Sequence, residues 1–229
     1  KFVKEVWKWK KESGDQILNQ LKKLGCSCDW SRNRFTMDKD LSEAVIKTFV
    51  QLYQKKIIYK DTKLVNWDTK LETAISDLEV EQKEVQSNLY YIKYKVVGEN
   101  NQIIIATTRP ETMLGDTAVA VNPKDDRYKN FVGKKIIIPI VNREVKIISD
   151  NFVASNQGSG ALKVTPAHDF NDFDIGKRHN LEFINIFEKN GKLNKNVPNK
   201  LVALDCFEAR NLIVKILKEK DLLEKIENI

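Results

Sequence analysis

Hydrophobic positions along the chain change their spacing near residue 88, from the three-to-four-residue repeat of helices to the alternation of strands. Before this point, Ser13 and Gln16 have the spacing of a capping box, which predicts a helix that Gly25 ends. A second helix is predicted to begin after Asp38 or Asp40. Its apolar face consists of Leu41, Val45, Phe49, Leu52 and Tyr53. The first 60 residues are therefore expected to be helical.

After Leu89 the alternating pattern predicts a series of short strands. These are Tyr90–Val97, Ile103–Thr108, Thr117–Val121, Lys135–Ile140, Glu144–Ile148, Ala161–Thr165 and Phe183–Phe187. The first two flank Gly98–Asn101, which indicates a hairpin. Asp169–His179 is predicted to be a short helix, and a last amphipathic helix begins near Asp205. Its predicted apolar face is Phe207, Leu212, Ile213, Ile216 and Leu217.

Many short strands with few helices between them indicate an α+β protein built around a closed or nearly closed β-barrel, with helical segments at both ends. We expect three parts along the chain. Residues 1–84 form a basic helical arm with an acidic connector, residues 85–200 a β-rich domain, and residues 201–229 a C-terminal helix with a return segment.

Composition narrows the class of protein only slightly. The 229 residues include 41% hydrophobic and 31% charged residues, which is near the globular average and excludes collagen, low-complexity and coiled-coil classes. No apolar run approaches the roughly 20 residues of a membrane span, so no membrane partner is expected. The three cysteines favour a reducing, cytoplasmic compartment over a disulfide framework. The start, without Met or a signal peptide pattern, suggests a piece of a longer cytoplasmic chain.

The net charge of +7 is confined to the first quarter of the chain. Residues 1–60 contain 14 basic and 7 acidic residues, whereas the remainder contains 25 of each. A basic patch of this kind is typical of proteins that bind nucleic acid. Solvated helix faces in a lysine-rich chain explain the same excess, and charge alone favours that second interpretation.

Several kinds of catalytic site have no support in the sequence. Cys26 and Cys28 lack the two-residue spacer of common zinc sites, so no metal site is predicted. The chain has no G-x-S-x-G motif, and Ser159 between two glycines fits a tight turn before a strand. It also has neither a Walker A motif nor G-x-G-x-x-G, so ATP and dinucleotide binding are not expected.

Polar residues instead gather where predicted strands end. Residues Thr107–Thr112 combine hydroxyls, a cation and a carboxylate in one turn, and Lys163 and Thr165 share one face of a strand. Asp169 and Asp172 lie one helical turn apart, also on one face. Each feature alone has an ordinary explanation, such as threonine in a strand or aspartate as a helix cap. Together they indicate the lining of a polar pocket.

These stretches resemble the editing domains of class I aminoacyl-tRNA synthetases, most closely the valyl type. The resemblance rests on Thr107–Pro123 and Gly158–His179, which read TTRPETMLGDTAVAVNP and GSGALKVTPAHDFNDFDIGKRH. Leu64–Asp68 and Thr73–Val80 resemble the segment that leads into this insertion, and Cys26–Arg32 an earlier helical part. The valyl type is favoured over leucyl and isoleucyl siblings by Glu111, Gly115–Thr117, Lys163 and Gly176–His179.

The resemblance implies hydrolysis of threonine wrongly esterified to the valine tRNA, after transfer and without a metal. Asp172, Thr108 and Lys163 are the residues expected to take part in catalysis, with Asp172 holding the substrate ammonium. The residues expected to bind substrate are Thr107, Arg109, Gln157, Thr165 and Asp169. Of these, Thr165 and Asp169 would read the threonine hydroxyl together with Lys163. Gln157 stands where valyl relatives can carry an aromatic residue near the terminal adenosine.

The same resemblance implies binding partners, and it implies that this part of the protein uses no cofactor. The expected partners are the 3′ aminoacyl-adenosine end of tRNA(Val) and the catalytic domain of a parent synthetase, in a monomer. No cofactor is expected, because the H-x-G-H and K-M-S-K-S motifs of the ATP-using catalytic domain do not occur in the chain. Two alternatives remain open at this stage: editing for an isoleucyl or leucyl sibling, and a tRNA-docking or spacer module without catalysis.

Overall fold

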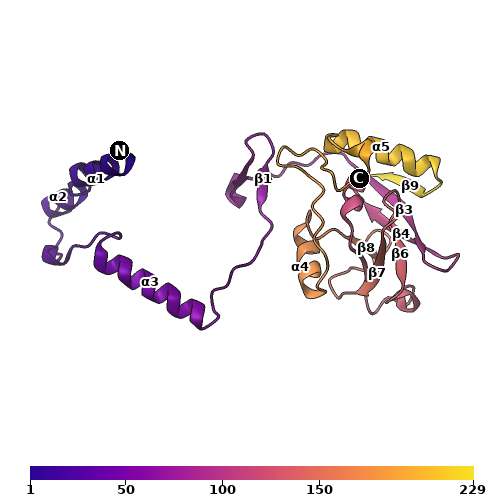
Figure 1. Ribbon diagram of the computed structural model, residues 1–229, viewed down its shortest axis with the longest axis horizontal. Coiled ribbons are helices and arrows are strands. Elements are labelled where there is room, and N and C mark those ends of the chain that lie inside the picture. The colour runs from indigo at the N-terminus through magenta and orange to yellow at the C-terminus, as the bar shows by residue number, and fades with distance from the viewer. The chain divides into compact units, whose positions relative to one another are not determined.

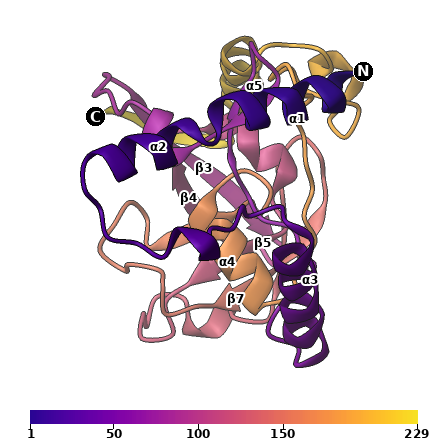
Figure 2. The same cartoon turned by 90° about the vertical axis from the view of Figure 1, so that its left-hand side faces the viewer.

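The computed structural model describes residues 1–229, which divide into two compact units, Lys1–Thr62 and Lys63–Ile229. The first unit contains α1 (Phe2–Ser13), α2 (Gln16–Lys23), α3 (Lys39–Gln54) and a short 3₁₀ helix at Trp30–Arg32 (Figures 1 and 2). No helix combines the length and the apolar character that crossing a membrane requires.

The predicted capping box at Ser13 is wrong, whereas the start of α3 after Asp38 is confirmed. Ser13 is the last residue of α1, and the Gly14 N–H continues that helix by donating to the Lys10 carbonyl at 2.8 Å. Ser13 therefore has helical backbone geometry and cannot act as the non-helical cap of the next helix. Helix α1 lies within the first 60 residues, which were expected to be helical, although no boundaries were predicted for it.

The second unit is built on one sheet of seven strands (Figure 1). They are β3 (Asn88–Val96), β4 (Gln102–Thr107), β5 (Ala118–Val121), β6 (Lys135–Ile137), β7 (Glu144–Ser149), β8 (Ala161–Val164) and β9 (Leu223–Asn228). Their order is β4-β3-β6-β7-β5-β8, with β9 also paired to β3, and all pairs except β5–β7 are antiparallel. The two ends of this order, β4 and β8, lie side by side. The predicted α+β fold with a nearly closed barrel is thus confirmed.

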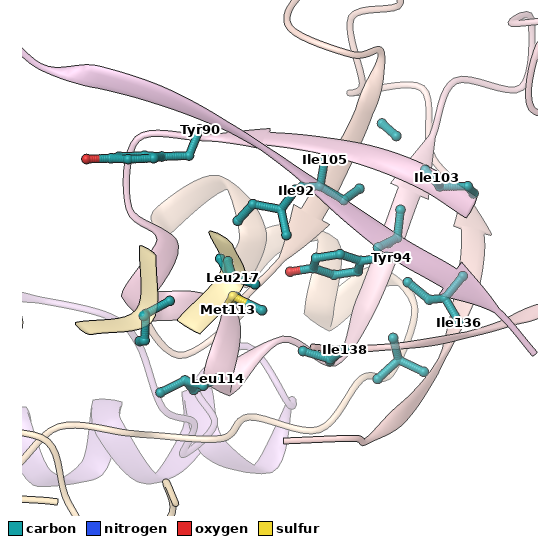
Figure 3. Packing of buried hydrophobic residues seen from close by; sticks show 14 of the residues in the cluster. Tyr90, Ile92, Tyr94, Ile103, Ile105, Met113, Leu114, Ile136, Ile138 and Leu217 are labelled. Atoms are coloured by element: carbon teal, nitrogen blue, oxygen red, sulfur yellow. The ribbon is translucent and has the colours of Figure 1, made fainter. Parts of the chain in front are cut away.

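Alternating residues of β3 and β4 point into the barrel and form its core (Figure 3). Ile92, Tyr94 and Val96 of β3 are at most 2% exposed. They pack with residues of β4, β6 and α5 (Cys206–Glu219), among them Ile103, Ile105, Ile136 and Leu217. Burying one such side chain contributes about 1.5–3 kcal/mol to folding, so the alternation in the sequence is what selects this face.

Helix α5 begins as predicted, with a capping box between Asp205 and Glu208. Its buried residues are Ala209, Ile213, Ile216 and Leu217. Phe207, expected on this apolar face, is 63% exposed, which corrects the prediction. It lies in the first turn of the helix, where its ring is covered by the guanidinium of Arg210 at 5.1 Å rather than by the core.

Three further elements differ from the expectations. Phe183–Phe187 is not a strand and forms only an isolated bridge between Phe187 and Leu193, because the Ile186 N–H is bonded to a side chain. The hairpin of β1 (Asn66–Asp68) and β2 (Thr73–Ile75) was not predicted, because the hydrophobic residues of this segment follow no clear helix or strand spacing. Strand β9 was missed because its mainly polar sequence extends the pattern of the preceding helix.

Helix α4 (Phe170–Arg178) packs closely against the turn that follows β8. A Cβ atom added at Gly176 would lie 2.7 Å from Pro166 Cβ and 3.2 Å from Phe183 Cζ. The Gly176→Ala variant is therefore expected to lose about 1–2 kcal/mol of unfolding free energy, because overpacking exceeds the gain in helix propensity. Urea denaturation measures this loss. Asp174→Ala, at an exposed position of α4, is the control, and equal stability of both variants would contradict the close packing.

Candidate functional site

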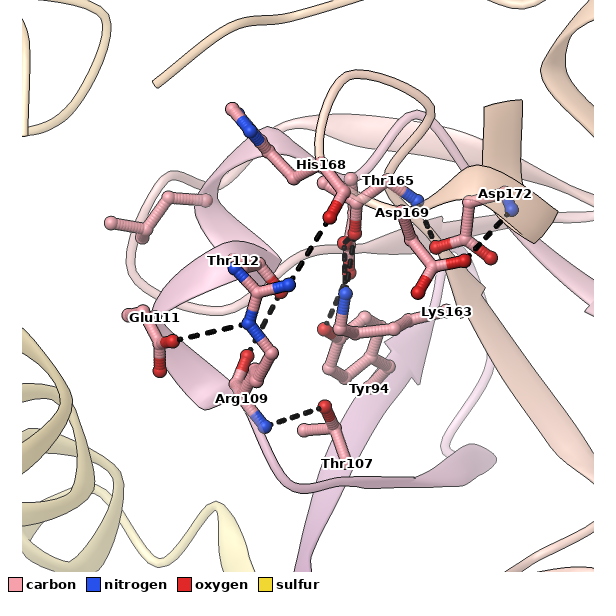
Figure 4. Close-up of polar contacts among 12 residues, drawn as sticks. Tyr94, Thr107, Arg109, Glu111, Thr112, Lys163, Thr165, His168, Asp169 and Asp172 are labelled. Carbon is pink, nitrogen blue, oxygen red and sulfur yellow. Dashed lines mark hydrogen bonds and ion pairs between the residues drawn. The ribbon is translucent and has the colours of Figure 1, made fainter. Parts of the chain in front are cut away.

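A buried polar network occupies the interior edge of the barrel beside β8 (Figure 4). Thr165 Oγ1 donates to Asp116 Oδ1 at 2.6 Å, and Lys163 Nζ lies 3.4 Å from the same oxygen. Lys163 also donates to the Thr165 hydroxyl. The three residues are at most 7% exposed. The strand spacing that places Lys163 and Thr165 on one face therefore brings both to a single carboxylate.

Two further residues hold Asp116 in place, one at its carboxylate and one, just before β7, at its backbone carbonyl. Tyr94, in the middle of β3, donates its hydroxyl to Asp116 Oδ2 at 2.8 Å. The guanidinium of Arg143 donates to the carbonyls of Leu114 and Asp116, both at 2.8 Å. Burial raises the pKa of the Asp116 carboxyl, an effect that Lys163 and the two hydroxyls oppose. Burial likewise raises the pKa of Tyr94 well above its ordinary value, so this residue stays a hydrogen-bond donor.

A second carboxylate, Asp172, lies in the first turn of α4, next to this network. Asp169 caps the helix by accepting from the N–H groups of Asn171 and Asp172 at 2.8 and 3.2 Å. Asp172 Oδ2 accepts from the Thr165 N–H at 2.8 Å, and no hydrogen bond engages Oδ1. Burial raises the pKa of Asp172 to about 6. At neutral pH the chain therefore holds a largely ionised, 5% exposed carboxylate that could bind a cation.

Arg109 and His168 continue the site on the other side of the turn after β8. The Arg109 N–H donates to Thr107 Oγ1 at 3.1 Å, and Arg109 Nη1 donates to the His168 carbonyl at 3.1 Å (Figure 4). His168 Nε2 accepts from the Ile186 N–H at 3.0 Å. Burial, followed by the charges of Arg109 and Lys163, lowers the pKa of His168 to about 4. The imidazole is therefore neutral, and its Nε2 is already engaged in a hydrogen bond.

An open cavity of about 1030 Å³ adjoins these residues. Arg109, His168 and Asp169 form one wall. The other walls come from residues 64–69, 185–191 and 205–207, and the first two are joined by a 2.8 Å hydrogen bond from Trp67 Nε1 to the Lys189 carbonyl. Lys163, Thr165 and Asp172 are not part of this lining. No group of three or more His, Cys, Asp or Glu side chains is placed to hold a metal ion.

The structure brings most, but not all, of the predicted site residues together. Lys163 and Thr165 share one hydrogen-bond network with Asp172 and Asp169, and the turn at 165–168 connects it to Arg109 and Thr107. Thr108 is half-buried at the end of β4. Gln157 is exposed and bonds to none of the other predicted site residues. Its neighbour Gly158 does approach β4, since a Cβ there would lie 2.8 Å from Ala106 Cβ.

Three members of the site were not predicted from the sequence: Tyr94, Asp116 and Arg143. Asp116 had one usable signal, because it is a carboxylate placed two residues before the fully buried strand β5. Tyr94 had another, since its hydroxyl lies at an inward position of an alternating strand and needs a buried partner. Arg143 follows an ordinary turn and carries no such signal in the sequence.

The fold and the buried polar site agree with the similarity of this chain to known proteins. The chain belongs to the class I tRNA synthetases: the family model for tRNA synthetases class I (I, L, M and V) matches residues 1–219. Among curated proteins, it is 62% identical over its whole length to a valine–tRNA ligase of Pelagibacter ubique. It is 54% identical over 99% of its length to a valine–tRNA ligase of Syntrophotalea carbinolica.

The chain spans about a quarter of the length of these relatives, 26% and 25% respectively. A similar fold occurs in the crystal structure of a ternary LeuRS–tRNA–LeuAMS complex from Agrobacterium radiobacter. The TM-score is 0.51 at 18% identity, covering 96% of this chain and 36% of that chain. The predicted resemblance to a valyl-type synthetase segment is thereby confirmed.

Proposed function

We propose that the unit Lys63–Ile229 is the post-transfer editing site of a valine–tRNA ligase, which hydrolyses the ester of threonyl-tRNA(Val). The main observation in support of this proposal is the buried carboxylate of Asp172. Burial raises its pKa to about 6, and its Oδ1 has no hydrogen bond. An aminoacyl ester carries an α-ammonium, which would supply the missing cation. Family membership and similarity to valine–tRNA ligases support the same substrate class.

The network around Asp116 explains how such a site would distinguish threonine from valine. The two side chains have nearly the same shape, so a second pocket cannot sort them by size. Lys163 and Thr165 can exchange hydrogen bonds with a threonine hydroxyl, with Asp169 next to them at the helix cap. A valine methyl in that place would desolvate these polar groups without offering them a hydrogen bond in return, which costs about 1–3 kcal/mol per buried group.

The ester and the terminal adenosine would lie along Thr107, Thr108 and Arg109, with Gln157 at the edge. The cavity beside Arg109 has room for the end of a nucleic acid strand. In this arrangement the proposed partners are tRNA(Val) and the catalytic domain of the parent synthetase.

Hydrolysis would proceed by attack of water on the positioned ester, without a covalent intermediate and without a metal. Orientation and electrostatic stabilisation would supply most of the rate enhancement, with Lys163 and Arg109 as the cations of the site. His168 is an unsuitable base because its Nε2 already accepts a hydrogen bond. Since Asp172 would hold the ammonium, the ribose hydroxyl next to the ester is our candidate for the proton relay.

Deacylation should depend on pH through Asp172. Above a pKa of about 6 the carboxylate is ionised and binds the ammonium, whereas below it the neutral acid cannot. We expect kcat/KM for threonyl-tRNA(Val), corrected for spontaneous ester hydrolysis at each pH, to fall about tenfold per pH unit below that value. A corrected kcat/KM that stays constant from pH 7 to pH 5 would contradict the assignment of Asp172.

The proposal itself is tested by incubating threonyl-tRNA(Val) with the full-length synthetase that carries this sequence. Release of threonine faster than the spontaneous rate supports an editing site. A docking or spacer module would bind the tRNA without accelerating release, and that outcome would overturn the proposal.

A further inference from the structure

Glu111 is a buried carboxylate that the proposed chemistry does not use. It lies in the 3₁₀ helix Pro110–Gly115, is 1% exposed, and faces α5. Arg210 of α5 donates to both of its oxygens, with Nε–Oε2 and Nη2–Oε1 distances of 2.8 Å. This fork geometry is the strongest arrangement of an arginine on a carboxylate. The pair joins residues 99 positions apart in the chain.

A second arginine competes for the same carboxylate. Arg109 Nε lies 3.6 Å from Glu111 Oε1, the oxygen that Arg210 Nη2 already binds. Beside this long ion pair, Arg109 Nη1 donates to the His168 carbonyl at 3.1 Å (Figure 4). The 47% exposed side chain of Arg109 lines the cavity. Arg210 thus takes the two short hydrogen bonds of Glu111, and Arg109 has only the longer contact to this carboxylate.

We propose that Arg210 is a positioning residue that keeps Arg109 directed at the cavity by occupying both oxygens of Glu111. This inference rests on the proposed function, in which Arg109 contacts the tRNA end. Without Arg210, Glu111 would be a buried carboxylate without its bidentate partner, which is strongly unfavourable. Arg109 is the cation next to it, and its guanidinium would turn from the His168 carbonyl to Glu111. The cavity would then lose its arginine.

A purely structural role for Arg210 makes a different prediction. If Arg210 only attached α5 to the 3₁₀ helix, its loss would lower activity to the same extent whether or not residue 109 is an arginine. Removing the charge of Glu111 would then not restore the activity lost with Arg210. The two roles are therefore separated by double variants rather than by a single substitution.

The experiment measures kcat and KM for threonyl-tRNA(Val) with the full-length synthetase. Arg210→Met and Arg109→Gln should each lower kcat/KM by about 10- to 100-fold, the range of a charge-assisted hydrogen bond. The Arg109→Gln/Arg210→Met double variant should be no worse than Arg109→Gln alone. Glu111→Gln/Arg210→Met removes the uncompensated charge and should regain most of the activity. Additive losses in the first double variant, or no recovery in the second, would overturn the inference.

A crystal structure of the Arg210→Met variant separates this inference from the proposed function. We expect the Arg109 guanidinium within hydrogen-bond distance of Glu111 and away from the His168 carbonyl. An Arg109 that keeps its place overturns the positioning role whatever the activity. A wild-type enzyme that releases no threonine overturns the proposed function, and the crystal structure then decides the positioning role alone.

Discussion

Replacing Asp172 with asparagine is expected to abolish deacylation while making the protein more stable. The amide oxygen can still accept from the Thr165 N–H, but it cannot pair with an ammonium, so kcat/KM for threonyl-tRNA(Val) should fall about 100-fold or more. Burial raises the pKa of Asp172 from 3.8 to about 6, so its contribution to stability is complete below pH 3.8 and is lost as pH rises through 6. At pH 7.5 the neutral side chain should raise the free energy of unfolding by about 1–3 kcal/mol.

Urea denaturation and single-turnover deacylation measure the two effects on the same Asp172→Asn protein. Asp174→Asn, an exposed carboxylate on the same helix, is the matched control and should change neither quantity. The opposite directions of the two effects are the distinctive feature, because ordinary damage to a fold lowers both. A variant that is less stable than the wild type, or that deacylates normally, would contradict the role assigned to Asp172.

Replacing Asp116 with alanine should have the largest effect on stability. The Lys163 ammonium would lose its carboxylate partner in the barrel, and the hydroxyls of Tyr94 and Thr165 would lose their acceptor. Breaking a buried charge pair by removing one partner costs about 3–5 kcal/mol of unfolding free energy. Urea denaturation at pH 7.5 measures this loss.

Tyr94→Phe is the matched control for the Asp116 variant, because it removes one hydrogen bond to the same carboxylate and leaves the charge pair intact. It should cost about 1–2 kcal/mol. If Asp116→Ala destabilises the protein no more than Tyr94→Phe does, the carboxylate does not balance the charge of Lys163, and the polar network described above is wrong.

Local patterns were sufficient to predict most of the barrel. The alternation in β3 and β4 and the caps of α4 and α5 depend on residues a few positions apart, and these elements lie where expected. Prediction failed where partners distant in sequence decide the structure. The mainly polar strand β9 pairs with β3, and the Ile186 N–H of Phe183–Phe187 bonds to a side chain instead of a neighbouring strand.

The candidate site likewise contains residues that are close in sequence and were predicted, and residues that are distant in sequence and were not. Lys163, Thr165, Asp169 and Asp172 lie within ten residues of one another, so the strand and helix periods already place them together. Tyr94, Arg143 and Arg210 reach the site across sequence separations of 22, 27 and 99 residues. No periodicity connects such residues to Asp116 or Glu111, and only the closure of the barrel and the packing of α5 bring them into contact.

The most direct test of the editing proposal compares two esters of one tRNA. Threonyl-tRNA(Val) and valyl-tRNA(Val) are each incubated with the full-length synthetase, under conditions that prevent the released amino acid from being attached to the tRNA again. The first-order rates of amino acid release are then compared. We expect threonine to be released at least tenfold faster than valine, since one or more buried polar groups would face the valine methyl, and Asp172→Asn should remove the difference. Equal rates for the two esters, or a preference for threonine that survives in Asp172→Asn, would contradict the proposal.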